Sequence, residues 1–104
     1  MSFKALTEPV QEVCDLYCER NGIERDDDWF LLKMQEELGE LVQAHLRLTA
    51  RGRLKGASRV ELEQARADEA ADLLCQVLLY CRRFGIDPDQ AVSHKWLSWL
   101  DKAA

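Results

Sequence analysis

The stretch from Ala70 to Cys81 constrains the fold more than any other part of the chain. Its apolar residues occupy nearly every direction around a helical axis, which is typical of a helix that is buried on all sides. A chain of 104 residues can hardly bury such a helix by itself. We therefore predict an all-α fold of the four-helix-bundle type, which oligomerisation completes.

Capping residues and apolar spacing indicate four helices. Thr7 precedes an acid and a proline, as is typical of a helix start, and Gly22 follows an asparagine at a plausible helix end. Ser58 and Glu61 have the spacing of a capping box in front of the longest helix. The expected helices cover residues 7–21, 29–51, 59–84 and 88–101, and residues 1–104 form a single domain.

Two pairs of acids interrupt the apolar pattern. Glu37 and Glu40 lie three residues apart in the expected helix 29–51, and Glu69 and Asp72 repeat this spacing in helix 59–84. Residues three apart share one helical face, so each pair presents its carboxylates together. Within the apolar stretch, Asp72 and Gln76 fall with Glu69 on one narrow strip. The polar groups of this helix are therefore concentrated along a single line.

The helix 29–51 is expected to bury an apolar stripe with Glu37 on its margin and Glu40 farther round the axis. His45 falls within this stripe, and we interpret it as a histidine of the core or of an interface. The residues of the predicted stripe are Leu31, Met34, Leu38, Leu41, Val42, His45 and Leu48.

Four carboxylates cannot be brought together in apolar surroundings without a compensating positive charge, because the repulsion and desolvation cost several kcal/mol. Oxygen ligands without histidine or thiolate favour Mg²⁺, with Mn²⁺ as a substitute, and Mg²⁺ commonly binds substrate phosphates. Glu36 is the candidate base that accepts a proton from the attacking water. A di-iron centre is disfavoured, since neither histidine stands three residues after a glutamate.

Acids at helical spacing are more often a solvated face that is paired with lysines. Asp72 argues against this interpretation, because it lies in a stretch with almost no other charge. A second hypothesis stays open, in which the chain is a non-catalytic helical module that binds metal or nucleotide as a regulator or partner.

The two motifs, Glu36-Glu37 with Glu40 and then Glu69 with Asp72, resemble the EExxE…ExxD signature of the MazG-like, all-α nucleoside triphosphate pyrophosphatase superfamily. Dimeric dUTPases, dCTPases and phosphoribosyl-ATP pyrophosphatases also belong to it. The resemblance implies hydrolysis of a (deoxy)nucleoside triphosphate to monophosphate and pyrophosphate, with Mg²⁺ held by the four acids other than Glu36. It also implies a homodimer or homotetramer.

Several residues are candidates for substrate binding. The resemblance implies that Lys95 meets phosphate and that Gln76 contacts the nucleotide. Lys33 borders the acids on the same helix, and an aromatic ring at a helix start, such as that of Trp29, can stack on a base. The glycine-containing basic segment around Arg53 and Lys55 is either a solvated turn or a mobile arm that reaches a polyphosphate.

Charge and cysteine usage restrict the partners and the compartment. The net charge of −5 argues against nucleic acid as a partner, since nucleic-acid binding needs a basic surface. The chain shows neither a secretory signal nor an apolar run of roughly 18 residues that would span a membrane. The four cysteines lack metal-ligand spacing and are expected to be reduced. We therefore expect a cytoplasmic protein.

Overall fold

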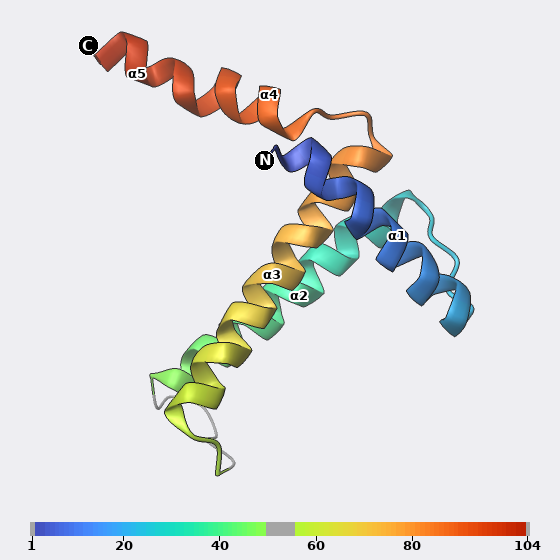
Figure 1. The fold of residues 1–104 in the computed structure, drawn as a ribbon, viewed down its shortest axis with the longest axis vertical. Helices are drawn as coiled ribbons and strands as arrows, with labels where there is room; N and C mark the ends of the chain where they lie inside the picture. Colours follow the sequence, from blue (N-terminus) through green and yellow to red (C-terminus); the bar gives the residue numbers. More distant parts are fainter. Residues whose placement is uncertain (1, 50–55, 104) are drawn as a thin grey trace. The chain divides into compact units, whose positions relative to one another are not determined.

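A computed structural model describes residues 2–49 and 56–103. In these two ranges the chain forms helices and no strand, which confirms the all-α class. No helix in them is long and apolar enough to cross a membrane. The elements are α1 (Phe3–Asn21), α2 (Asp27–Leu48), α3 (Arg59–Arg83), α4 (Pro88–Val92), the π-helical segment η1 (Ser93–Leu97) and α5 (Ser98–Ala103) (Figure 1).

The chain divides into two compact units. One unit contains the residues up to Arg25 together with those from Leu78 onward, and the other runs from Asp26 to Val77. Helix α3 therefore begins in the second unit and ends in the first.

Helix α1 starts earlier than expected, and the predicted start at Thr7 is wrong. Ser2 is the capping residue, and the Asp89 carboxylate accepts hydrogen bonds from the backbone N–H groups of Phe3 and Lys4, each at 3.0 Å. Thr7 lies inside the helix, where its hydroxyl donates to the carbonyl of Phe3 at 2.7 Å. The Ser2 hydroxyl, which accepts from the N–H of Ala5 at 3.0 Å, is a local signal for this start, whereas the second acceptor, Asp89, is 86 residues away from Phe3 along the chain.

Other local predictions hold. Gly22 and Gly85 adopt φ angles of 62° and 68°, the left-handed conformation expected where α1 and α3 end. The serine cap before α3 is confirmed, because the N–H of Glu61 donates to the Ser58 hydroxyl at 3.2 Å, while the Glu61 carboxylate accepts from this hydroxyl at 3.0 Å. The expected last helix, 88–101, is interrupted by the π-helical segment η1 and continues to Ala103.

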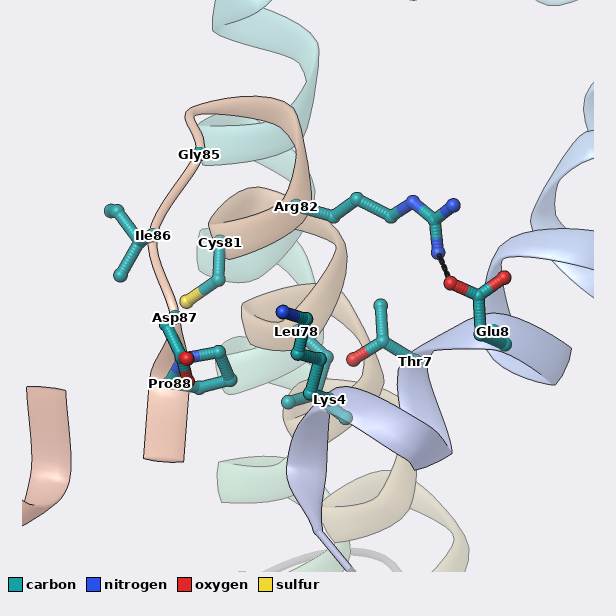
Figure 2. Close-up of a pocket in the computed structure, with 10 residues that line it drawn as sticks. All are labelled: Lys4, Thr7, Glu8, Leu78, Cys81, Arg82, Gly85, Ile86, Asp87 and Pro88. Atoms are coloured by element: carbon teal, nitrogen blue, oxygen red, sulfur yellow. Dashed lines mark hydrogen bonds and ion pairs between the residues drawn. The ribbon is translucent and has the colours of Figure 1, made fainter. Parts of the chain in front are cut away.

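The first unit contains a cavity of about 330 Å³ (Figure 2). It is lined by the first turns of α1, the end of α3 and the turn that leads into α4. At its border the Arg82 guanidinium forms an ion pair with the Glu8 carboxylate at 2.8 Å. None of the four predicted metal ligands lines this cavity. All four lie in the second unit.

In the second unit α2 and the first part of α3 run antiparallel to each other (Figure 1). Helix α2 buries Phe30, Glu37 and Ala44, which are seven residues apart. The predicted stripe is wrong at Leu31 and Leu38, which are 53% and 50% exposed. The buried line lies one residue earlier, about 100° round the helix, because α2 is apolar on two adjacent faces and tertiary packing selects between them.

Val42 and His45 of the predicted stripe are also exposed within the single chain, so the place of His45 in an interface stays a prediction. On α3, Leu74 and Val77 are 43% and 38% exposed, so the chain alone does not bury this helix on all sides. Apolar side chains of both helices in the hairpin therefore stay exposed in the single chain.

Candidate metal centre

Four carboxylates meet where α2 and α3 lie side by side. Glu37 and Glu40 project from α2, and Glu69 and Asp72 project from α3. One oxygen of each carboxylate lies within 4.8 Å of the others. The three-residue spacing places each pair on one face of its helix, and the antiparallel packing turns the two faces toward each other. The structure therefore brings together all four residues that the sequence analysis predicts as metal ligands.

Part of the centre is buried from solvent, and its negative charge is poorly compensated. Glu37 is only 8% exposed, and one oxygen of Glu37 and one of Glu69 are buried without a hydrogen-bond partner among the described residues. Lys33 supplies one positive charge, since its Nζ lies 3.6 Å from Glu37 Oε1. Four carboxylates beside one ammonium leave an excess of negative charge, and buried unpaired carboxylate oxygens destabilise the fold.

The protonation equilibria reflect this excess. Burial raises the pKa of Glu37, and repulsion from Glu40 raises it further, while the charge of Lys33 opposes the shift. Burial likewise raises the pKa of Glu69, and hydrogen bonding with Glu40 and repulsion from it add to the effect. A raised pKa means that the folded site favours an added positive charge. Either protons or a metal ion can provide that charge.

The ligand atoms fit a hard divalent cation. All four are carboxylate oxygens, which are the preferred ligands of Mg²⁺ and Mn²⁺. Cys75 lies three residues after Asp72, but burial and the charge of Asp72 raise the pKa of its thiol. The thiol therefore stays protonated at neutral pH and is a poor metal ligand. The two buried unpartnered oxygens need the positive charge that such a cation carries.

Three further predicted residues lie on the same hairpin. The ammonium of Lys33 lies 3.3 Å from Glu36 Oε2 as well as near Glu37, so it borders the acids as expected. Glu36 is exposed and lies outside the cluster of four, and its role as a base or an outer metal contact stays a prediction. Gln76 follows Asp72 by one turn of α3, and its Oε1 is buried without a partner in the described residues.

The remaining predicted substrate contacts are Trp29, Lys95, Arg53 and Lys55. Trp29 lies at the start of α2 and packs edge-on against Phe30, with ring centroids 5.0 Å apart. Lys95 belongs to η1 in the first unit. Arg53 and Lys55 lie outside the described residues. Their binding roles stay predictions.

The sequence analysis did not include Asp68 in the site, although its charge contributes to the raised pKa of Glu69. Its carboxylate accepts a hydrogen bond from Gln64 Nε2 at 2.8 Å and is exposed. The signal for its influence was its position next to Glu69. Its exposed and hydrogen-bonded carboxylate contributes negative potential rather than a ligand atom.

The fold and the acid centre define an all-α protein with a candidate site for a hard divalent cation. The family model of phosphoribosyl-ATP pyrophosphohydrolase matches residues 5–94, a range that includes both acid motifs. The chain therefore belongs to this family, which is part of the all-α nucleoside triphosphate pyrophosphatase superfamily. Membership makes it a hydrolase that acts on a phosphoanhydride. Neither the curated proteins nor the solved structures contain a significant match to the chain.

Proposed function

We propose that this protein is a Mg²⁺-dependent pyrophosphohydrolase that cleaves the α–β phosphoanhydride of a nucleotide carrying a triphosphate. The products are the corresponding monophosphate and pyrophosphate. Nucleoside triphosphates, deoxynucleoside triphosphates and phosphoribosyl-ATP all belong to this substrate class. The observation that carries the proposal is the cluster of four carboxylates with two buried, unpartnered oxygens.

Glu37, Glu40, Glu69 and Asp72 would hold Mg²⁺, with Mn²⁺ as a substitute. Bound there, the ion would offset the charge of the phosphates and lower the pKa of a coordinated water. Because the four acids carry more negative charge than one divalent cation neutralises, a polyphosphate needs further positive groups nearby. Lys33 is the described cation that lies closest to this role, since it already contacts Glu37.

Glu36 is the proposed general base. Its carboxylate is exposed and adjoins Glu37 in the chain, so it can accept a proton at the edge of the site. A water oxygen adds to one phosphorus of the α–β anhydride, the bridging P–O bond breaks, and the proton of the water passes to Glu36. The ion pair with Lys33, at 3.3 Å, holds the Glu36 carboxylate beside the acids.

The other predicted contacts complete the proposed substrate site. Lys95, Arg53 and Lys55 would bind phosphate, and Trp29 would stack on the base.

We also propose that the protein works as a homodimer or homotetramer in the cytoplasm, without a nucleic-acid or membrane partner. Exposed apolar side chains at helical spacing on both helices of the hairpin support self-association. They are Leu31, Leu38, Val42, Leu74 and Val77. The described cysteines are free thiols, which suits a reducing compartment.

The test is a panel of nucleoside triphosphates, deoxynucleoside triphosphates and phosphoribosyl-ATP, incubated with the protein and Mg²⁺. Pyrophosphate release from at least one substrate is expected, and Asp72→Asn should lower its rate by roughly 10²- to 10³-fold. The matched control is Glu8→Gln, which changes an acid of the first unit. Absence of pyrophosphate from every substrate would refute the enzyme. Tight nucleotide binding in that case would favour the non-catalytic module.

A further inference from the structure

The side chain of Gln76 has a buried oxygen without a hydrogen-bond donor. This atom, Oε1, has no partner among the described residues, and the same is true of one oxygen each of Glu37 and Glu69. Gln76 lies one turn after Asp72 and two turns after Glu69, on the strip of α3 that carries the acids. A buried amide oxygen without a donor is destabilising, so this position requires a donor that the described residues of one chain do not supply.

The size of that partner is limited. Gln76 Oε1 has almost no solvent-accessible area, so any donor has to displace the neighbouring side chains slightly. A water molecule needs the smallest displacement, whereas a nucleotide base would have to separate the two helices. Buried polar atoms of this kind are commonly satisfied by an ordered water.

The position of Gln76 on α3 favours a water at the metal centre. Side chains on a helix lean toward its N-terminus, and for Gln76 this is the direction of Asp72 and Glu69. Mg²⁺ usually keeps several waters, whose polarised O–H groups need acceptors. An amide oxygen accepts such a bond without adding to the negative charge of the site.

We propose that Gln76 accepts a hydrogen bond from a water held by the divalent cation at the four-carboxylate centre. The inference rests on the proposed cation site and gives Gln76 a different role from the nucleotide contact that the sequence resemblance implies. Gln76 is then a positioning residue, which orients the water and strengthens cation binding before any nucleotide arrives.

The test measures Mn²⁺ binding without nucleotide, by calorimetry and by the electron paramagnetic resonance of the bound ion. Gln76→Met keeps the length of the side chain and removes the acceptor, so its affinity should fall by about 10- to 100-fold. Gln76→Glu keeps an acceptor and should bind at least as tightly as the wild type. Gln43→Met, at an exposed position of α2, is the matched control and should leave the affinity unchanged.

Circular dichroism establishes that each variant is folded. If Gln76→Met is not, Gln76→Asn replaces it, because it retains the amide but withdraws the oxygen by one methylene and should also bind more weakly. Unchanged Mn²⁺ affinity in the folded variant, with a raised KM for nucleotide, would overturn the inference and assign the amide to the substrate. Failure of the wild type to bind Mn²⁺ would instead refute the cation site and, with it, this role.

Discussion

The two units of the chain differ in how the charges of their carboxylates are compensated. In the first unit the carboxylates of Asp15 and Glu8 form ion pairs at 2.8 Å, with Arg25 and Arg82 respectively. In the second unit four carboxylates lie together beside Lys33, and two of their oxygens are buried without a hydrogen-bond partner among the described residues. Paired charges at the surface contribute little to stability, whereas gathered like charges oppose folding. Acids that a fold keeps at such a cost are better explained by a bound cation than by structure.

Substitutions in the two units should differ most in their effect on catalytic turnover. Asp72→Asn or Glu40→Gln should lower kcat/KM by roughly 10²- to 10³-fold, since a bound metal ion contributes several kcal/mol to transition-state stabilisation. Pyrophosphate release measures this loss. Glu8→Gln, which removes a paired acid, should keep its activity. Equal losses of activity from the substitutions in both units would contradict a specific catalytic role for the four acids.

Stability without metal should depend on pH in a direction that the acid centre determines. The pKa values of Glu37 and Glu69 are raised in the folded protein, chiefly by burial. Their contribution to stability is therefore present below the ordinary pKa of 4.5 and is lost as pH rises through the raised values. Thermal unfolding from pH 4 to 8 should show this loss in the presence of a chelator.

Mg²⁺ should cancel that loss at neutral pH, because it supplies the positive charge that protons supply in acid. A rise in Tm of several degrees is expected, since 1 kcal/mol corresponds to roughly 4–8 °C in a small domain. Glu37→Gln should reduce both the pH dependence and the response to Mg²⁺. A Tm that ignores Mg²⁺ at pH 8 would contradict the cation site.

A smaller effect is expected at the start of α1. Asp89→Ala leaves the N–H groups of Phe3 and Lys4 without their carboxylate acceptor. The free energy of unfolding should fall by about 1–2 kcal/mol, the usual cost of losing a helix cap. Urea denaturation measures it, with Asp101→Ala at an exposed position of α5 as the control. Equal changes in the two variants would show that Asp89 is not a cap.

The smallest effect concerns the ion pair of Asp15 with Arg25. Hydrogen bonds from Arg25 and Gln11 lower the pKa of Asp15. Its contribution is therefore present above the ordinary pKa and is lost as pH falls through the lowered value, opposite in sign to that of the acid centre. Asp15→Asn should cost about 0.2–1 kcal/mol at most, because the pair is partly exposed, and less at high salt. Urea denaturation at two salt concentrations measures it.

Local patterns predicted much of the fold. The all-α class, the glycine ends of α1 and α3 and the serine cap before α3 depend on residues within a few positions of one another. The start of α1 was missed because Thr7 with Glu8 and Pro9 also has the pattern of a helix start, although Ser2 caps the helix locally and Asp89 adds an acceptor from the other end of the chain. The buried face of α2 was also missed, because Leu31 and Leu38 compete with Phe30 and Glu37 for the inward direction.

The spacing of three residues was enough to predict which acids lie together on each helix, because it places two side chains on one face whatever surrounds the helix. Tertiary packing was needed to bring the faces of Glu37 and Glu69 together, to bury one oxygen of each, and to leave Gln76 Oε1 buried without a donor among the described residues. Helical periodicity is a property of one segment. Burial and charge compensation are properties of two surfaces in contact, so the four acids became a candidate cation site only when α2 and α3 packed together.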